Sequence, residues 1–314
     1  MNPTTTRAFP TVTAGRIGSV IDLLSGPRRL GDKRILRDKV GGKTVVLTGA
    51  SFGLGAATAQ LLAQAGATVY MGSRSIAQLE EIAREIEATG GQAIPLALDL
   101  TDPRSIDAFA QDVLSSTDRI DFLIHNAGRS LRRSLRLSYD RPSDLTSTTG
   151  VNYLGPMHLT MKLLPRLREQ NAPAHIVNVS TVGVQLPPTA RWGFYVSSKA
   201  AFTSWLTSAA LEARQDGVTL TTIYTGLIHS RMSAPSGWMQ RSPGKSPEQA
   251  ALVVARAVAK RPRTLSTSYG LVSMWLQPFL RTPLQIIGEQ FAKRSGDTPA
   301  ALGIAPRAHE EGDQ

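Results

Sequence analysis

The chain of 314 residues contains no cysteine, and this absence excludes disulfide bonds, thiolate metal sites and a covalent cysteine mechanism. The chain also lacks any apolar run that approaches the ~20 residues needed to span a membrane. Residues 1–15 hold no continuous apolar stretch, so we expect no secretory signal. We therefore expect a cytoplasmic protein without a metal site, with peripheral contact at a membrane left open.

Acidic residues are fewer than basic residues. The 24 aspartates and glutamates are outnumbered by 35 lysines and arginines, which gives a formal net charge of +11. Such an excess permits a nucleic acid, an anionic lipid or a polyanionic small molecule as a partner. No helix-turn-helix, zinc-finger or RNA-binding motif is visible, so we expect no nucleic-acid partner.

Strands and helices alternate from residue 43 onwards. Apolar runs predict the strands, and longer segments with helical periodicity lie between them. The expected strands are 44–48, 69–71, 93–98, 122–124, 176–179 and 218–224. The expected helices are 56–65, 76–88, 103–114, 156–170, 195–214 and 253–260. This alternation predicts an α/β fold of the Rossmann type, a doubly wound parallel sheet with helices on both faces.

We expect a single catalytic domain over residues 43–263, with extensions at both ends. Residues 1–42 form an arginine-rich leader with a short amphipathic helix, which would pack on the protein body, on a second subunit or on a membrane surface. The apolar residues of this helix are Ile17, Val20, Ile21 and Leu24. Residues 264–294 form an amphipathic extension, and residues 295–314 form a flexible polar tail.

A glycine-rich segment follows the first expected strand and opens the first expected helix. Its glycines permit a tight turn and allow a pyrophosphate to approach the backbone. The helix N-terminus then offers N–H donors and a favourable dipole to phosphate groups. The segment predicts a dinucleotide site formed by Gly49, Ser51, Phe52, Gly53, Leu54 and Gly55.

The end of the second expected strand favours NADP(H) over NAD(H). An NAD-dependent enzyme would place a carboxylate there for the ribose 2′-hydroxyl, whereas this chain has Ser73 followed by Arg74. A guanidinium binds a 2′-phosphate in a bidentate manner. Phe52 leaves the glycine-rich segment without a second basic residue. Asp99 would either accept a hydrogen bond from the adenine amino group or serve as a carboxylate at a helix N-terminus.

Tyr195 and Lys199 lie one helical turn apart on the same face of an expected helix. An ammonium next to a phenol favours the phenolate and so lowers the pKa of the tyrosine. A tyrosine tuned in this way exchanges a proton with a carbonyl or alcohol oxygen. Of the six tyrosines, Tyr195 alone has a lysine four residues later.

Together these features resemble the compact branch of the short-chain dehydrogenase/reductase family. The glycine-rich segment, residues 125–128, Asn152, Ser180 and the Tyr195–Lys199 pair occur in that family's order and spacing. The resemblance implies an NADP(H)-dependent oxidoreductase that forms a dimer or tetramer. It also implies further cofactor contacts from Asp99, Leu100, Asn126, Ala127, Gly128, Tyr195, Lys199, Gly226, Ile228 and Ser230.

The resemblance implies a catalytic tetrad. Tyr195 donates a proton to the substrate oxygen as hydride reaches the carbon, and Ser180 hydrogen-bonds the same oxygen. Lys199 lowers the pKa of the tyrosine and holds the nicotinamide ribose, while Asn152 places a water behind the lysine. His125 stands where the family has asparagine, and we assign it no catalytic role. Thr225-Gly226 replaces the family's Pro-Gly pair, which indicates a changed nicotinamide or substrate loop.

A narrower resemblance, to bacterial fatty acyl-CoA reductases, rests on residues 126–134, 152–155 and 246–263. Four arginines in the first of these segments and just beyond it recur at helical spacing, so a helix would place them on one face. That face would bind the phosphates of coenzyme A or remain a solvated basic surface. The arginines are Arg129, Arg132, Arg133 and Arg136.

We therefore expect reduction of a lipophilic acyl substrate, from fatty acyl-CoA to fatty aldehyde. A ketone or aldehyde reductase for lipophilic substrates is the alternative, and a non-catalytic dinucleotide-binding sensor or membrane-surface scaffold is the alternative of another class. The apolar residues between 271 and 287 would pack as ordinary core, cap a substrate channel, dock on a bilayer or form a subunit interface.

Overall fold

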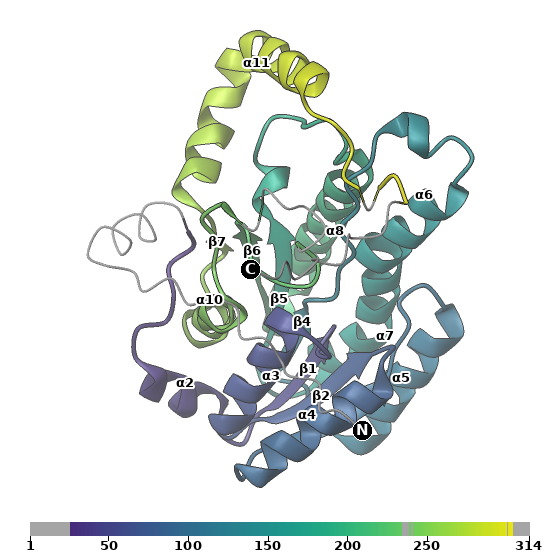
Figure 1. The fold of residues 1–314 in the computed structure, drawn as a ribbon. Coiled ribbons are helices and arrows are strands. Elements are labelled where there is room, and N and C mark those ends of the chain that lie inside the picture. The colour runs from purple at the N-terminus through teal and green to yellow at the C-terminus, as the bar shows by residue number, and fades with distance from the viewer. Residues whose placement is uncertain (1–25, 234–238, 240, 300, 304–314) are drawn as a thin grey trace, which may run out of the picture.

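The computed structural model describes residues 26–233, 239, 241–299 and 301–303, and it confirms the Rossmann-type α/β fold (Figure 1). Within these residues a seven-stranded parallel sheet has the order β3-β2-β1-β4-β5-β6-β7. The strands are β1 (Thr44–Thr48), β2 (Thr68–Ser73), β3 (Gln92–Ala97), β4 (Phe122–His125), β5 (Ala174–Thr181), β6 (Val218–Thr225) and β7 (Thr264–Leu265). The strand order reverses between β1 and β4, and folds of this type bind ligands at such a point.

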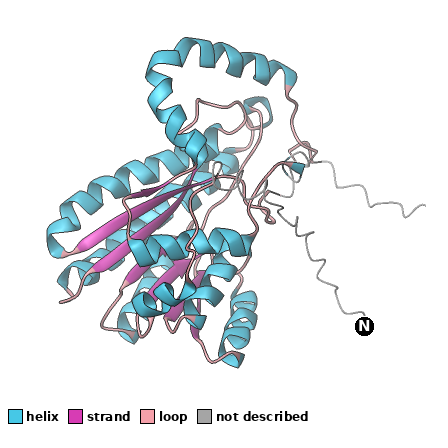
Figure 2. Ribbon diagram, turned by 90° about the vertical axis from the view of Figure 1, so that its left-hand side faces the viewer, coloured by secondary structure: helices cyan, strands magenta, loops and turns pink. Residues whose placement is uncertain are grey.

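Helices cover both faces of the sheet (Figure 2). The α-helices are α2 (Lys33–Val40), α3 (Gly53–Gln64), α4 (Ile76–Ala88), α5 (Pro103–Ser116), α6 (Pro142–Thr149), α7 (Gly155–Glu169), α8 (Gly193–Glu212), α10 (Pro247–Lys260) and α11 (Ser268–Arg294). Shorter turns are η1 (Leu135–Leu137), the π-helical η2 (Gly150–Leu154), η3 (Val182–Val184) and η4 (Ala213–Asp216). One apolar core joins α2, α3, α4 and α10 to the sheet, and a second core joins α5, α7 and α8 to its other face.

Strand β1 shows why the strands appear in the sequence as continuous apolar runs. Val45 and Leu47 belong to one core, and Val46 belongs to the other. Because both faces of a parallel sheet are covered, residues pointing either way must be apolar. Helix α10 begins at Pro247 rather than at the expected Val253, since its first turn is stabilised by a capping box of Ser246 and Gln249.

The extensions are tied to the body of the protein. The leader helix expected around residues 17–24 lies outside the described residues, but α2 buries Leu36 and Val40. Strand β7 continues the sheet beyond residue 263. Residues 295–299, expected as the start of a flexible tail, are anchored instead: Asp297 Oδ1 accepts a hydrogen bond from the backbone N–H of Ser134 at 2.7 Å. Among the helices of the described residues, none is long and apolar enough to cross a membrane.

The expectation of an arginine-bearing helix is wrong. Residues 129–134 are not helical, and only the short η1 follows them. Arg133 NH1 donates to both carboxylate oxygens of the buried Asp144, at 2.7 and 2.6 Å. Arg132 NH2 donates to the carbonyl oxygen of Gly296 at 2.9 Å. Two of the four arginines thus bind partners in other parts of the fold, whereas Arg129 and Arg136 are exposed.

We expect Asp144→Ala to lower the free energy of unfolding by about 3–5 kcal/mol, because it leaves the Arg133 guanidinium buried without its counter-ion. The side chains of Arg133 and Asp144 are only 11% and 4% exposed. Urea unfolding followed by circular dichroism measures the change. Asp38→Ala, which removes an exposed carboxylate of α2, should change stability by less than about 0.5 kcal/mol. Equal losses in the two variants would contradict this account.

Candidate active site

The glycine-rich turn joins β1 to α3 where the strand order reverses. Gly49 and Gly53 have positive φ angles of 71° and 53°, in the left-handed region that favours glycine. A Cβ on Gly55 would lie 1.9 Å from the carbonyl oxygen of Gly49. Among the described residues no side chain caps the N-terminus of α3 at Phe52. This turn fits a pyrophosphate, since the first N–H groups of a helix bind anions.

The loop after β4 is locked to the end of β1. Asn126 Nδ2 donates to the carbonyl oxygens of Thr48 and Gly49, at 3.1 and 3.0 Å. The backbone N–H groups of Asn126 and Ala127 both donate to Thr48 Oγ1, at 3.2 and 3.1 Å. Two predicted cofactor-binding segments are therefore held side by side at the carboxyl edge of the sheet.

Lys199 is buried behind this loop. Its Nζ donates to the carbonyl oxygens of Val179 and Ala127, at 3.0 and 3.4 Å. Burial lowers the pKa of Lys199 to about 8, so its ammonium persists at neutral pH. A Cβ on Gly128 would lie 3.2 Å from Nζ, so glycine leaves room for the lysine at this position.

Asn152 lies in the π-helical turn η2 between α6 and α7. Its Oδ1 accepts a hydrogen bond from the backbone N–H of Arg129 at 2.8 Å, and its Nδ2 donates to the carbonyl oxygen of the same residue at 2.9 Å. Nδ2 also lies 3.0 Å from Ser198 Oγ on α8. Single π-helical turns occur preferentially at functional sites, and this one joins the 126–129 loop to the helix that carries Lys199.

Tyr195 lies in the first turns of α8, partly exposed and packed against Trp192 with ring centroids 5.8 Å apart. Burial raises the pKa of Tyr195, and a hydrogen bond with the Thr181 side chain partly opposes that rise. The expected lowering by Lys199 is not observed in this structure, because the ammonium is directed at backbone carbonyls. The phenol is therefore protonated at neutral pH, the state required of a proton donor.

Ser180 and Thr181 point to opposite faces of β5. Ser180 is buried and its Oγ lies 3.1 Å from Thr203 Oγ1, whereas Thr181 is the residue that reaches Tyr195. Successive residues of a strand alternate between faces, so a difference of one position decides which hydroxyl enters the site. The sequence predicts Ser180 for this role, and Thr181, which directly follows it, is the residue in contact with Tyr195.

The residues predicted to bind the adenosine lie at the ends of β2 and β3. Ser73 Oγ donates to Ser51 Oγ at 2.8 Å, which links β2 to the glycine-rich turn, and Arg74 beyond it is exposed. Asp99 Oδ1 accepts hydrogen bonds from the backbone N–H and the hydroxyl of Thr101, at 2.8 and 2.7 Å. Although burial opposes it, these bonds and the nearby Arg74 lower the pKa of Asp99, so its carboxylate is charged.

A second cation reaches the glycine-rich turn from a distant part of the chain. The Arg231 guanidinium carbon lies 3.9 Å from the centroid of the Phe52 ring. A Cβ on Gly53 would lie 3.4 Å from that of Ser230, so the loop after β6 meets this turn. The sequence interpretation missed Arg231. The same loop carries the predicted cofactor contacts Gly226, Ile228 and Ser230.

His125 is a buried, neutral side chain. Its Nε2 lies 2.9 Å from Thr160 Oγ1, and its ring packs edge-on against Phe202. Burial, together with the charge of Lys199, lowers the pKa of His125 to about 3. The imidazole of His125 is therefore uncharged at neutral pH.

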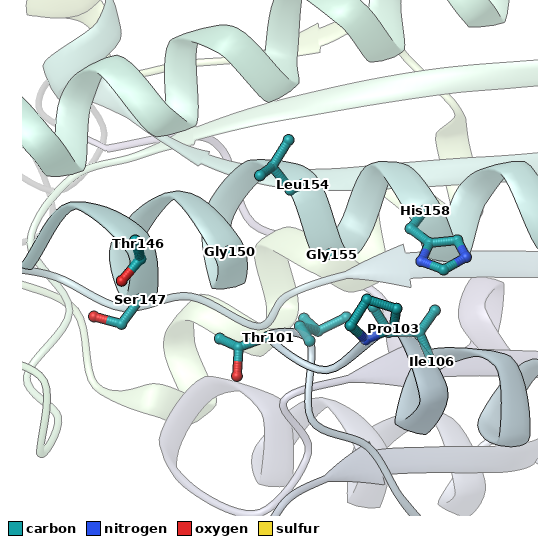
Figure 3. Close-up of a pocket in the computed structure, with 10 residues that line it drawn as sticks. Thr101, Pro103, Ile106, Thr146, Ser147, Gly150, Leu154, Gly155 and His158 are labelled. Carbon is teal, nitrogen blue, oxygen red and sulfur yellow. The ribbon is translucent and has the colours of Figure 1, made fainter. Parts of the chain in front are cut away.

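A hollow of about 410 Å³ lies beside these residues, between the start of α5 and the turn η2 (Figure 3). Its walls are formed by Leu100, Thr101, Pro103, Ile106, Thr146, Ser147, Gly150, Leu154, Gly155 and His158. The walls include Leu100 of the predicted cofactor site but not Asn152, Tyr195 or Lys199. The hollow therefore does not contain the predicted catalytic groups.

Comparison with known proteins agrees with this geometry. The sequence profile of the short chain dehydrogenase family matches residues 43–240. The chain belongs to the short-chain dehydrogenase/reductase family. It is therefore an oxidoreductase that uses a nicotinamide cofactor and a small-molecule substrate, and the glycine-rich turn fits such a cofactor. The resemblance inferred from the motifs is confirmed.

The alignments with individual relatives are longer than the segment that the family profile matches. A fatty acyl-CoA reductase of Acinetobacter baylyi is 39% identical over 272 residues, covering 86% of this chain and 90% of that protein. An uncharacterized oxidoreductase of Mycobacterium tuberculosis is 39% identical over 273 residues, covering 86% and 80%. The structure of a metagenomic short-chain oxidoreductase in complex with NADP has a TM-score of 0.62 at 30% identity, covering 73% and 96%. The narrower resemblance to fatty acyl-CoA reductases is thus also supported.

We expect Thr181→Val to reduce kcat for carbonyl reduction by about 10²–10³-fold, the usual effect of losing one hydrogen bond to a developing oxyanion. Ser180→Ala is the matched control. It should reduce kcat by less than about tenfold, because the Ser180 hydroxyl points into the core. Steady-state kinetics with a long-chain acyl-CoA measure both values. A larger loss in Ser180→Ala than in Thr181→Val would reassign the role to Ser180.

Proposed function

We propose that this enzyme uses NADP(H) to reduce a lipophilic acyl substrate, a fatty acyl-CoA, to the fatty aldehyde. The observation that carries the proposal is the identity to the Acinetobacter baylyi fatty acyl-CoA reductase, which extends over 86% of this chain. The protonated phenol of Tyr195 supports it chemically, because reduction of a carbonyl requires a proton donor at the oxygen.

The proposed catalytic roles follow from the positions of the side chains. The nicotinamide, when bound, supplies a hydride to the carbonyl carbon of the thioester. Tyr195 gives its proton to the carbonyl oxygen, and the Thr181 hydroxyl hydrogen-bonds that oxygen. The resulting hemithioacetal expels the coenzyme A thiol and leaves the aldehyde. Since the chain has no cysteine, no thioester with the protein forms.

Lys199 and Asn152 help to return a proton to Tyr195 after each turnover. In the proposal the Lys199 ammonium holds the nicotinamide ribose, and Asn152 positions a water that returns a proton to Tyr195. The Asn152 side chain already binds the backbone N–H and carbonyl oxygen of Arg129, at the end of the loop that contacts Lys199. The role of Asn152 is thus one of positioning.

The preference for NADP(H) rests on two cations at the adenosine end. Arg74 follows Ser73 at the end of β2, where an NAD-dependent enzyme would have a carboxylate. Arg231 lies on the ring of Phe52 and supplies the second positive charge that the glycine-rich segment lacks. Guanidinium groups suit a 2′-phosphate because they donate in pairs.

We expect Arg74→Ala to raise KM for NADPH by about 10- to 100-fold, the effect of losing a hydrogen bond to a charged group, and to leave KM for NADH nearly unchanged. Initial rates with both cofactors and one substrate give the comparison. Arg84→Ala, which removes an exposed arginine of α4, is the control. Parallel changes for NADPH and NADH would show that Arg74 does not bind a 2′-phosphate.

A second function would use the same residues. A ketone or aldehyde reductase for lipophilic substrates would need the same proton donor and no binding of coenzyme A. The non-catalytic alternatives, a dinucleotide-binding sensor or a membrane-surface scaffold, do not agree with membership of an oxidoreductase family. We also propose that the protein is a cytoplasmic homo-oligomer, a dimer or tetramer, in peripheral contact with membrane lipids.

The proposed reaction predicts that NADPH is oxidised with a long-chain acyl-CoA and that one free thiol appears per NADPH. Absorbance at the nicotinamide band and a thiol reagent follow the two quantities. Tyr195→Phe should lower kcat by at least about 10²-fold, because it removes the proton donor. Oxidation with the matching aldehyde or a bulky ketone alone would favour the reductase alternative. Undiminished turnover in Tyr195→Phe would contradict the mechanism.

A further inference from the structure

The two faces of α11 are reversed relative to an ordinary surface helix. A helix that packs on a globular core normally turns its apolar side inward. The partly buried positions of α11 are mostly small or polar: Ser273, Gln277, Leu284, Gly288 and Ala292. Its large apolar side chains are exposed: Leu271, Val272, Met274, Trp275, Leu276, Phe279, Leu280, Ile286, Ile287 and Phe291. The described residues leave this apolar face uncovered.

Contacts along α11 fix this orientation. Gln277 Nε2 donates to the carbonyl oxygen of Gln185 at 2.6 Å, and Gln185 Nε2 lies 3.1 Å from Met274 Sδ. Near the other end, Arg191 NH1 donates to the carbonyl oxygen of Ala292 at 3.4 Å. Helix α11 is thus an arch, kinked at its middle and held at both ends by residues 185–191 (Figures 1 and 2).

The arch stands over the catalytic groups. Residues 185–191, which hold it, belong to the segment that joins Thr181 to Tyr195. The first turn of α11 also reaches the loop after β6, since a Cβ on Gly226 would lie 3.2 Å from the hydroxyl of Tyr269. The uncovered apolar face therefore belongs to the side of the molecule on which the proton donor lies.

The chemistry of this face matches a bilayer interface. Trp275 and Phe279 are 78% and 82% exposed, and residues 268–280 include no charged residue. Lys293 and Arg294 close the helix. Tryptophan and phenylalanine on a helix that also carries basic residues are typical of helices that lie in the headgroup region.

We propose that α11 docks the enzyme onto the surface of an anionic lipid bilayer. The net charge of +11 attracts anionic headgroups. Docking places the segment between Thr181 and Tyr195 next to the lipid. A lipophilic substrate then passes from the bilayer towards Tyr195; this delivery step rests on the proposed acyl substrate, and the docking itself does not.

Flotation of the full-length protein with phospholipid vesicles tests the docking without cofactor or substrate. Vesicles of phosphatidylcholine with about 30 mol% phosphatidylglycerol should bind at least about tenfold more protein than vesicles of phosphatidylcholine alone. The double variant Trp275→Ser/Phe279→Ser should bind the anionic vesicles at least about tenfold more weakly, because it removes two large apolar side chains from the face. Leu211→Ser, at a 70% exposed leucine of α8, is the matched control and should bind like the parent.

Three results would overturn the docking: no flotation with anionic vesicles, equal binding by the double variant and the parent, or an equal loss in Leu211→Ser. Light scattering identifies the competing occupant. If the parent protein forms a dimer, does not bind vesicles, and becomes a monomer in the double variant, a second copy covers the face. Circular dichroism of the double variant verifies its fold. Acyl-CoA reduction without flotation refutes the docking alone, and flotation without acyl-CoA reduction refutes the proposed function alone.

Discussion

The buried ammonium of Lys199 is the interaction on which the rest of the site depends. Its acceptors are the backbone carbonyls of Val179 and Ala127, so the charge is held by oriented dipoles. A buried charge of this kind is costly unless its surroundings are arranged around it. Gly128 leaves the space that the lysine occupies, and His125 stays neutral. A charged imidazole there would add a second buried cation, so the departure from asparagine is compatible with the site.

The sheet brings the remaining groups to that ammonium. The carboxyl ends of β1, β4, β5 and β6 meet at one edge, and each carries one part of the site. These parts were predictable because their signals are local. A strand followed by glycines and a helix indicates a phosphate-binding turn, and the spacing of Tyr195 and Lys199 indicates a shared helix face. The Rossmann fold follows from the same kind of local pattern, repeated along the chain.

Other parts of the site depend on contacts that no local pattern contains. Strand periodicity predicts that Ser180 and Thr181 face opposite sides, but the sheet's packing decides which side holds the substrate. The helical spacing of the arginines was misleading because Asp144 binds one of them from another element. Arg231 meets Phe52 only because two loops distant in sequence converge. In each case the deciding contact comes from another element of the fold.

The orientation of helix α11 could likewise not be predicted from the sequence. The apolar residues of α11 lie around most of its circumference, so helical periodicity does not state which side faces the body. Gln185 and Arg191 decide that, because they bind the helix at both ends from the segment leading to Tyr195. Exposed apolar surface of this extent is unfavourable in water and usually marks an interaction site. A lipid phase that covers this face would also be the phase in which a lipophilic substrate dissolves, so one surface would serve both docking and substrate supply.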